Sequence, residues 1–267
     1  MSARPVAVLL RHLLRRHWRP LVAMSGGLML FQLVMTRMAP APNEVGWMSQ
    51  IMRAVPPELM ALAGSEASPI TPGGFLGLGY SHPFVMVLLS AWVIRVSSGA
   101  LAGEIGLGTM DLLASRPVSR WQHLAAALVF IGAGLVVLIG AACCGTALGL
   151  TIRPLGVVRH QVLAAGLMAW LLFAAWTGVG LFVSATRRES GPAIALTSAL
   201  VAVSFVLEYV ARVWQPVKSL RPFSLFSYYR PQGAIVSGIH ATDAMTLAAV
   251  AIVGVGLALA IFERRDL

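Results

Sequence analysis

The sequence predicts an all-α, polytopic integral membrane protein with six transmembrane helices and both termini in the cytoplasm. Apolar residues make up 58% of the 267-residue chain and charged residues only 11%, whereas soluble domains average about 25% charged residues. Six apolar stretches are long enough to cross a bilayer, which takes about 20 helical residues. The bilayer is therefore the expected solvent.

The six predicted spans lie within one transmembrane domain that covers residues 1–267. They comprise residues 20–38, 84–102, 124–150, 161–185, 192–211 and 244–262. The predicted segments between them include a cytoplasmic one at 103–120 and extracytoplasmic ones at 39–82 and 212–243.

Basic residues predict the orientation of these spans. Arg95 lies inside a span, and the other 19 of the 20 lysines and arginines divide eleven to eight between the two sides. The eleven lie directly beside span ends, where the positive-inside rule applies best. They are Arg4, Arg11, Arg15, Arg16, Arg19, Arg116, Arg120, Arg187, Arg188, Arg264 and Arg265. The net charge of +10 thus reflects membrane orientation, and nucleic-acid binding is not expected.

The N-terminal residues 1–19 are predicted to form an interfacial helix along the cytoplasmic leaflet. Apolar residues recur there at helical spacing with arginines near another face. A basic flank without a mechanical role is the alternative. Residues 39–41 imitate a signal-peptide cleavage site, but Arg37 and Pro42 flank it and cleavage would leave five spans. Retention of the first span is expected.

The polar segment 103–120 joins the second and third spans and has the features of a short capped helix. Gly108 interrupts the preceding helix, Thr109 suits an N-cap, and Asp111 suits the positive end of a helix. Pro117 ends this helix after about seven residues, roughly 10 Å. A partner that pushed such a helix would tilt both attached spans. The alternative interpretation of this segment is a surface loop with no mechanical role.

This segment resembles the cytoplasmic signature of permeases of type 2 ATP-binding cassette (ABC) exporters. The matching residues are Glu104, Gly108, Thr109, Asp111, Leu112, Leu113, Pro117, Val118 and Arg120. Two further stretches resemble the same family, namely Ser224, Phe226, Tyr228, Tyr229 and Pro231 before the last span, and Phe262, Arg264, Arg265, Asp266 and Leu267 at the end. With the six-span plan, the resemblance covers the whole chain. Relatives often carry a second acidic residue near Glu104, which this chain lacks.

The resemblance implies a permease subunit in the cell (inner or plasma) membrane that couples ATP hydrolysis by a separate nucleotide-binding subunit to export. It implies that the coupling segment contacts this ATPase through Glu104, Gly108, Thr109, Asp111, Arg116, Pro117 and Arg120. A second permease copy or homologue would complete the transporter, and Phe226, Tyr228 and Tyr229 would cover the outer mouth. ATP and magnesium belong to the partner, because this chain has no Walker A pattern. Neither a cofactor, a metal nor a catalytic residue is expected.

Arg95 and Glu208 are the two ionisable residues well inside predicted spans, and such costly groups mark functional sites by default. One hypothesis is that they pair or face a polar cavity along the translocation pathway. The alternative is that Arg95 snorkels and Glu208 reaches water near its span end. A stand-alone ion-coupled secondary transporter or channel, in which these two residues couple ion movement, is the rival function.

Three smaller patterns complete the prediction. Gly99-x-x-x-Gly103 and Gly145-x-x-x-Gly149 predict close helix packing. The adjacent Cys143 and Cys144 cannot join distant segments and are expected to pack in a span. Aromatic residues among prolines in 212–243 predict short helices at the interface. Substrate identity is not encoded in any pattern.

Overall fold

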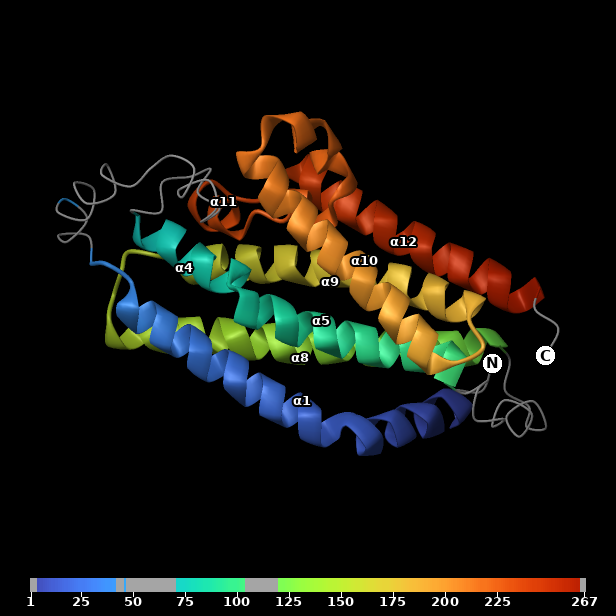
Figure 1. Ribbon diagram of the computed structural model, residues 1–267. Helices are drawn as coiled ribbons and strands as arrows, with labels where there is room; N and C mark the ends of the chain where they lie inside the picture. The colour runs from blue at the N-terminus through green and yellow to red at the C-terminus, as the bar shows by residue number, and fades with distance from the viewer. Residues whose placement is uncertain (1–3, 42–45, 47–70, 104–119, 265–267) are drawn as a thin grey trace.

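The computed structural model describes residues 4–41, 46, 71–103 and 120–264, and the regular structure in this part of the chain is entirely helical (Figure 1). The helices are α1 (Arg4–Met38), α4 (Pro72–Ser81), α5 (Pro83–Ser98), the π-helix η1 (Gly99–Gly103), α8 (Arg120–Ile152), α9 (Arg159–Thr186), α10 (Ser190–Val213), the 3₁₀-helices η2 (Gln215–Phe223) and η3 (Leu225–Tyr228), α11 (Pro231–Val236) and α12 (Ala241–Arg264).

The predicted all-α fold with six spans is confirmed. Five described helices are long and apolar enough to cross a membrane, and the bent pair of α4 and α5 provides a sixth span. The chain is therefore a multi-pass membrane protein. The described helices lie side by side in one bundle (Figure 1).

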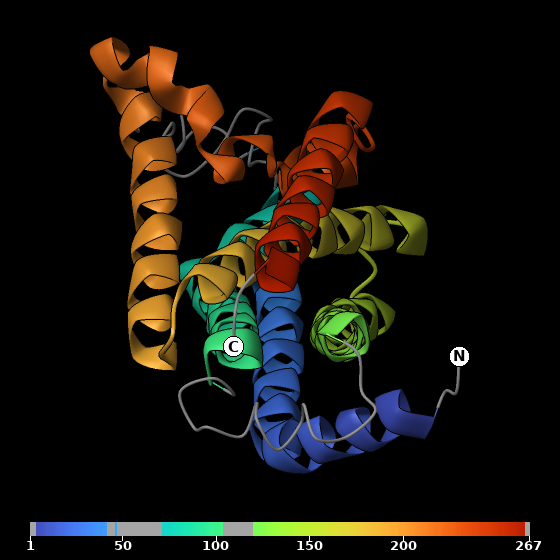
Figure 2. The same cartoon turned by 90° about the vertical axis from the view of Figure 1, so that its right-hand side faces the viewer.

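The first helix differs from the prediction of an interfacial helix followed by a separate span. α1 runs without interruption from Arg4 to Met38 and contains Pro20. Proline lacks an amide hydrogen and its ring crowds the preceding turn, which kinks a helix without always ending it. The N-terminal part of α1 accordingly runs at a steep angle to the rest (Figure 2). Its position at the leaflet surface stays a prediction.

The second span is preceded by a helix, α4, which lies within the predicted outer segment 39–82. Thr71 caps α4 by accepting a hydrogen bond from the Gly74 amide at 3.0 Å, and α4 ends at Ser81. The Nδ1 atom of His82 then accepts from the Phe84 amide at 3.2 Å and caps α5. Because Pro83 disfavours helical geometry at His82, the two helices meet at a 40° bend.

Small residues allow the closest helix contacts. A side chain at Gly145 would overlap the Met29 backbone, and one at Gly149 would overlap Thr36, so α8 and α1 touch along the predicted Gly145-x-x-x-Gly149 motif. The packing prediction for Gly99 is wrong, because none of the described atoms lies within 4 Å of a Cβ built there. Gly99 instead begins the π-helix η1.

The segment between α10 and α12 contains short helices, as predicted. η2, η3 and α11 follow one another away from the end of the bundle at which the two termini lie (Figure 1). We call this the outer end, because the basic residues predict that it is extracytoplasmic. Gly77 of α4 lies directly against the Gln232 backbone of α11. The Tyr229 hydroxyl donates to the Tyr80 carbonyl at 3.1 Å, so this segment is fastened to the beginning of the second span.

Candidate functional site

A cavity of about 620 Å³ lies between α5 and α10. α10 stands to one side of the bundle (Figure 2). Helical periodicity places the lining residues on two facing stripes. They are Pro83, Met86, Val87, Ser90, Ala91, Ile94 and Arg95 from the second span, Ile194, Ser198, Val201, Ala202 and Phe205 from α10, and Phe226 from η3. Val87 is 65% exposed, which shows that the cavity opens on the surface of the single chain.

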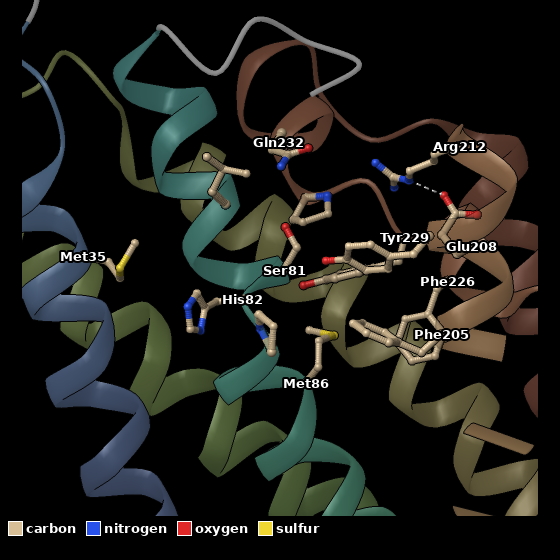
Figure 3. A pocket seen from close by; sticks show the side chains of 14 residues that line it. Met35, Ser81, His82, Met86, Phe205, Glu208, Arg212, Phe226, Tyr229 and Gln232 are labelled. Atoms are coloured by element: carbon tan, nitrogen blue, oxygen red, sulfur yellow. Dashed lines mark hydrogen bonds and ion pairs between the residues drawn. The ribbon is translucent and has the colours of Figure 1, made fainter. Parts of the chain in front are cut away.

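A second cavity of about 310 Å³ continues this space toward the outer end. Pro83, Met86, Phe205 and Phe226 line both cavities. Side chains of Met35, Ser81, His82, Glu208, Arg212, Tyr229 and Gln232 surround the outer one (Figure 3). The two cavities therefore adjoin along α5 and α10, and together we call them the path. Both walls are mostly apolar, and polar side chains are more numerous around the outer cavity.

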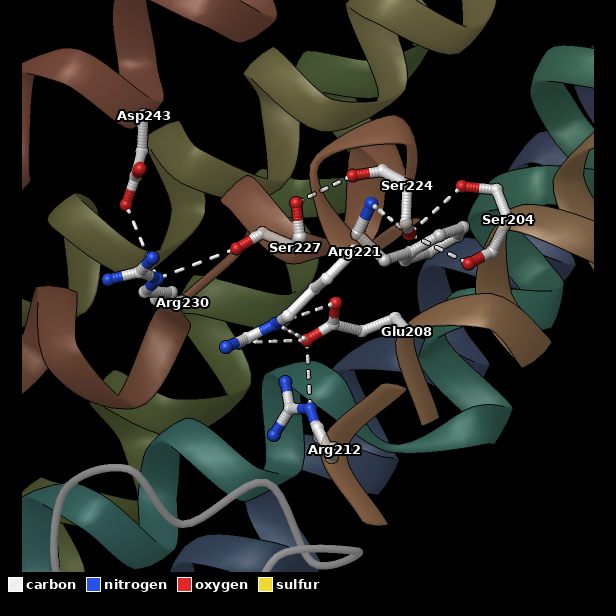
Figure 4. Close-up of polar contacts among 9 residues, drawn as sticks. Ser204, Glu208, Arg212, Arg221, Ser224, Ser227, Arg230 and Asp243 are labelled. Atoms are coloured by element: carbon white, nitrogen blue, oxygen red, sulfur yellow. Dashed lines mark hydrogen bonds and ion pairs between the residues drawn. The ribbon is translucent and has the colours of Figure 1, made fainter. Parts of the chain in front are cut away.

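The carboxylate of Glu208 is the centre of a buried ion cluster at the outer end of this path (Figure 4). Glu208 is only 2% exposed. Arg212 donates from Nε to Oε1 at 2.8 Å, and Arg221 donates from Nη2 to the same oxygen at 3.1 Å. The Nε atom of Arg221 also lies 3.2 Å from each carboxylate oxygen. The cluster thereby ties η2 to the last turns of α10.

A serine network makes the same connection one turn earlier on α10 (Figure 4). The Ser224 hydroxyl donates to the Ser204 carbonyl at 2.7 Å, and the Leu225 amide donates to the Ser204 hydroxyl at 3.1 Å. Ser227 donates to the Ser224 carbonyl at 2.7 Å. These bonds satisfy polar groups that are buried away from water. We call the unit formed by the outer half of α10, η2 and η3 the outer cap.

The predicted gate residues lie in or next to this outer cap. Phe226 is buried between Trp176 and Phe205, with ring centroids 6.0 and 5.4 Å away. Tyr229 is buried as well, and burial raises the pKa of its phenol, so that it remains a hydrogen-bond donor. Tyr228 lies nearer the surface and donates to the Pro222 carbonyl at 3.0 Å. Phe226 and Tyr229 therefore line the path, whereas no cavity described above includes Tyr228.

The structure does not pair Arg95 with Glu208. The carboxylate is held by Arg212 and Arg221, and Arg95 lines the inner cavity only. The spacing of Glu208 and Arg212, four residues apart on a helix, is a sequence signal that the prediction overlooked. Arg221 lies thirteen residues after Glu208 on another element, and helical spacing could not have identified it. Both charged residues nevertheless line the path, Arg95 in its inner cavity and Glu208 in the adjoining outer one.

The inner end of α5 is fastened to α9 through one side chain. The Ser184 hydroxyl donates to the Ser98 carbonyl at 3.0 Å and accepts from the Ala102 amide at 3.0 Å. These bonds satisfy backbone groups at the π-helix η1, where the regular α-helical pattern is lost. Ala102 also packs with Val183 and Ala193 in a small core. Movement of η1 should therefore be transmitted to α9 and α10.

Removing this hydroxyl is expected to loosen η1. In Ser184→Ala the buried Ala102 amide and Ser98 carbonyl lose their partner, at a cost of about 1–3 kcal/mol. Amide hydrogen exchange of the peptide that covers Ala102 should accelerate about tenfold or more, measured by mass spectrometry. Thr186→Ala is the control, because the Thr186 hydroxyl bonds only within α9, to the Val183 carbonyl at 2.7 Å. Equal exchange in both variants and the wild type would contradict this role of Ser184.

The predicted coupling residues Glu104, Gly108, Thr109, Asp111, Arg116 and Pro117 lie outside the described residues. So do residues 47–70 of the predicted outer segment and the last three residues of the chain. Arg120 is the first residue of α8, and its side chain also lies outside the described part. The structure does show what adjoins the coupling segment. It leaves α5 through η1 at Gly103 and enters α8 at Arg120.

A helical, multi-pass bundle with cavities along two of its spans is an architecture that the membrane component of a transporter would have. The model of the ABC-2 family transporter protein matches the chain over residues 48–267. The chain therefore belongs to the ABC-2 family and is a permease component of an ABC-type transporter, and the resemblance seen in the sequence is confirmed. This family is a transport component rather than a catalytic subunit. No curated protein gives a significant match to the chain.

Proposed function

We propose that this permease couples ATP hydrolysis by a separate nucleotide-binding subunit to the export of a substrate from the cytoplasm across the cell membrane. The observation that carries the proposal is the double role of the second span. α5 lines the inner cavity along most of its length, and its inner end leads through η1 directly into the coupling segment 104–119. A force on that segment would move a wall of the path.

Two features support transmission of such a force. Ser184 holds η1 against α9, and Arg120 begins α8, which packs along α1. The coupling segment is therefore attached at both ends to helices that pack deeply in the bundle. Helices packed in this way respond as rigid elements to a push at one end. ATP-driven closure of two partner ATPases would supply the push.

The exposed side of the path supports a second permease copy or homologue as a further partner. Val87 and Val203 are each 65% exposed and lie on α5 and α10. A path that is open along one side in a single chain would be closed by a related chain placed against these two helices. ATP and magnesium would bind in the ATPase partner, and Glu104, Gly108, Thr109, Asp111, Arg116, Pro117 and Arg120 would contact it.

Copurification tests the ATPase partnership. The chain, solubilised in detergent from its native host, should copurify with a nucleotide-binding subunit. The amount of this subunit recovered with the double variant Glu104→Ala, Arg116→Ala should be at least about tenfold lower, because two charged contacts are removed. The control is Arg188→Ala, Glu189→Ala, which removes the same charges from exposed positions between α9 and α10. Retention of the ATPase in the control and its loss from the double variant support the proposal.

Two other outcomes would contradict it. If the wild-type chain is isolated alone under several mild conditions, no stable ATPase partnership exists. If the purified chain moves substrate in liposomes without an ATPase, the stand-alone secondary transporter is the correct function. In that case Arg95 and the Glu208 cluster would be the groups to test for ion coupling.

A further inference from the structure

We propose that the inner cavity between α5 and α10 binds an amphiphile with an anionic headgroup and an apolar body, and that Arg95 binds the headgroup. The inference rests on the proposed function, because it assigns the class of cargo to the path described above. It goes beyond the transporter family, whose membership leaves the charge of the cargo open.

The lining of the inner cavity selects an apolar body. Apart from Arg95 and the two serines, the ten other residues that line this cavity have no side chain that forms hydrogen bonds. They are Pro, Met, Val, Ala, Ile and Phe residues. An uncompensated polar body would lose its hydrogen bonds to water there. A volume of about 620 Å³ lies within the range of sites for small organic ligands.

Arg95 is the one charged side chain among the described residues that line this cavity. It is exposed, and no hydrogen bond or ion pair joins it to another described residue. By contrast, Glu208 in the outer cavity is neutralised by two arginines. A cation without a partner at membrane depth is costly, and Arg95 has none among the described residues. A guanidinium binds carboxylate, sulfate or phosphate through two parallel hydrogen bonds. Ser90 and Ser198 of the facing stripes supply hydroxyl groups in the same cavity.

The position of Arg95 along α5 determines which way the amphiphile lies. Arg95 is eight residues before Gly103, about 12 Å along the helix axis. Trp92, one turn earlier, packs edge-on against His17 of α1 at 6.2 Å between ring centroids. Arg95 therefore lies in the inner half of the span, within reach of a headgroup that enters from the cytoplasmic leaflet. The apolar body would extend toward Phe205 and Phe226 at the other end of the cavity.

Binding of matched fluorescent amphiphiles tests the inference without ATP or an ATPase. The full chain is placed in nanodiscs of phosphatidylcholine and titrated with nitrobenzoxadiazole-labelled stearic acid, stearyl alcohol or stearylamine. The wild-type protein should bind the carboxylate at least about tenfold more tightly than the alcohol, as expected when a charged hydrogen bond is gained, and bind the amine most weakly. Arg95→Gln should reduce the preference to less than about twofold. Arg95→Glu should reverse it in favour of the amine.

Two controls locate the effect. Arg188→Gln removes an exposed arginine from the loop before α10 and should keep the full preference for the carboxylate. Ala202→Trp places a large side chain in the inner cavity and should weaken binding of the acid and the alcohol alike. Equal affinity of wild type for acid and alcohol would overturn the inference. This is also the result expected if an acidic residue of a second copy pairs with Arg95. An unchanged preference for the acid in both Arg95 variants would overturn the inference as well.

The result is separable from the test of the exporter function. A preference for the acid that depends on Arg95, found together with failure to copurify an ATPase, would leave the binding site standing in a transporter of another type. An ATPase that copurifies with a chain showing no charge preference would leave the exporter standing and remove the anionic amphiphile as its cargo.

Discussion

Replacing Gly145 by leucine is expected to cause the largest loss of folded protein among single changes in the bundle. A Cβ at this position would overlap the Met29 carbonyl of α1, which is backbone and cannot rotate away. Overpacking of a well-packed interior costs about 1–3 kcal/mol and occasionally more, and we expect a cost above about 3 kcal/mol here because the Met29 backbone must move. A cost of about 3 kcal/mol lowers the thermal unfolding midpoint by about 6–12 °C, at about 2–4 °C per kcal/mol. The midpoint of the detergent-solubilised Gly145→Leu variant should fall by at least about that much.

Gly140→Leu is the matched control for this change. Gly140 lies on the same helix, and none of the described atoms is within 4 Å of a Cβ built there. Both variants add the same side chain and remove the same backbone flexibility from α8, so the difference between them isolates the contact with α1. A midpoint of Gly145→Leu equal to that of Gly140→Leu would contradict the close approach of the two helices.

Replacing Glu208 by glutamine is expected to have the second-largest effect. The change keeps the shape of the side chain but leaves Arg212 and Arg221 facing each other around a neutral amide. Removing one partner from a buried ion pair costs about 3–5 kcal/mol, and the partial exposure of the two arginines places the expected loss at the lower end. The thermal unfolding midpoint measured in detergent should fall accordingly, whereas Glu189→Gln at an exposed position should leave it nearly unchanged.

The second arginine provides a direct test of the same cluster. If repulsion between the two cations causes the loss, Glu208→Gln combined with Arg221→Gln should recover part of the midpoint lost in Glu208→Gln alone. The outer cap should also loosen in the single variant, so that a cysteine introduced at exposed Ser219 of η2 reacts faster with a water-soluble maleimide. An unchanged midpoint and an unchanged labelling rate in Glu208→Gln would show that the cluster does not hold η2.

The two predictions concern opposite needs of a transporter. Contacts such as that of Gly145 with Met29 keep α1 and α8 together as a rigid pair. The outer cap instead joins α10 to η2 and η3 through charged and hydroxyl groups, with Phe226 and Tyr229 beside the path. Polar ties of this kind are specific in geometry and can be exchanged for others when the path opens. The cap is thus the part of the outer end best suited to move with α10.

Much of the fold was predictable because a bilayer imposes simple rules on sequence. A span needs about 20 apolar residues, and its backbone must be satisfied by its own helix, so length and hydropathy located all six spans. The Gly145 motif was readable for a similar reason, since small residues one turn apart permit contact. Gly99 has the same pattern without the contact. The chain forms the π-helix η1 there, and Ser184 stabilises it.

The family was also predictable from the residues alone, because the resemblance depends on local order along the chain. The caps of the coupling segment stay a prediction, since they lie outside the described residues. The bend at His82 was harder to predict from the sequence, although Pro83 signals a helix boundary. α4 was missed because its ten residues include four glycines or prolines among the first six, a composition typical of a loop.

The sequence by itself determined the class of protein, the six spans and the two charged residues inside them. Only the tertiary structure decided the partners of those charges, since Glu208 meets Arg221 across thirteen residues and Arg95 remains apart in the apolar cavity. The physical reason is that hydropathy and caps act between near neighbours in sequence. Side-chain pairing depends instead on how separate helices are placed and rotated against one another, which local periodicity does not encode.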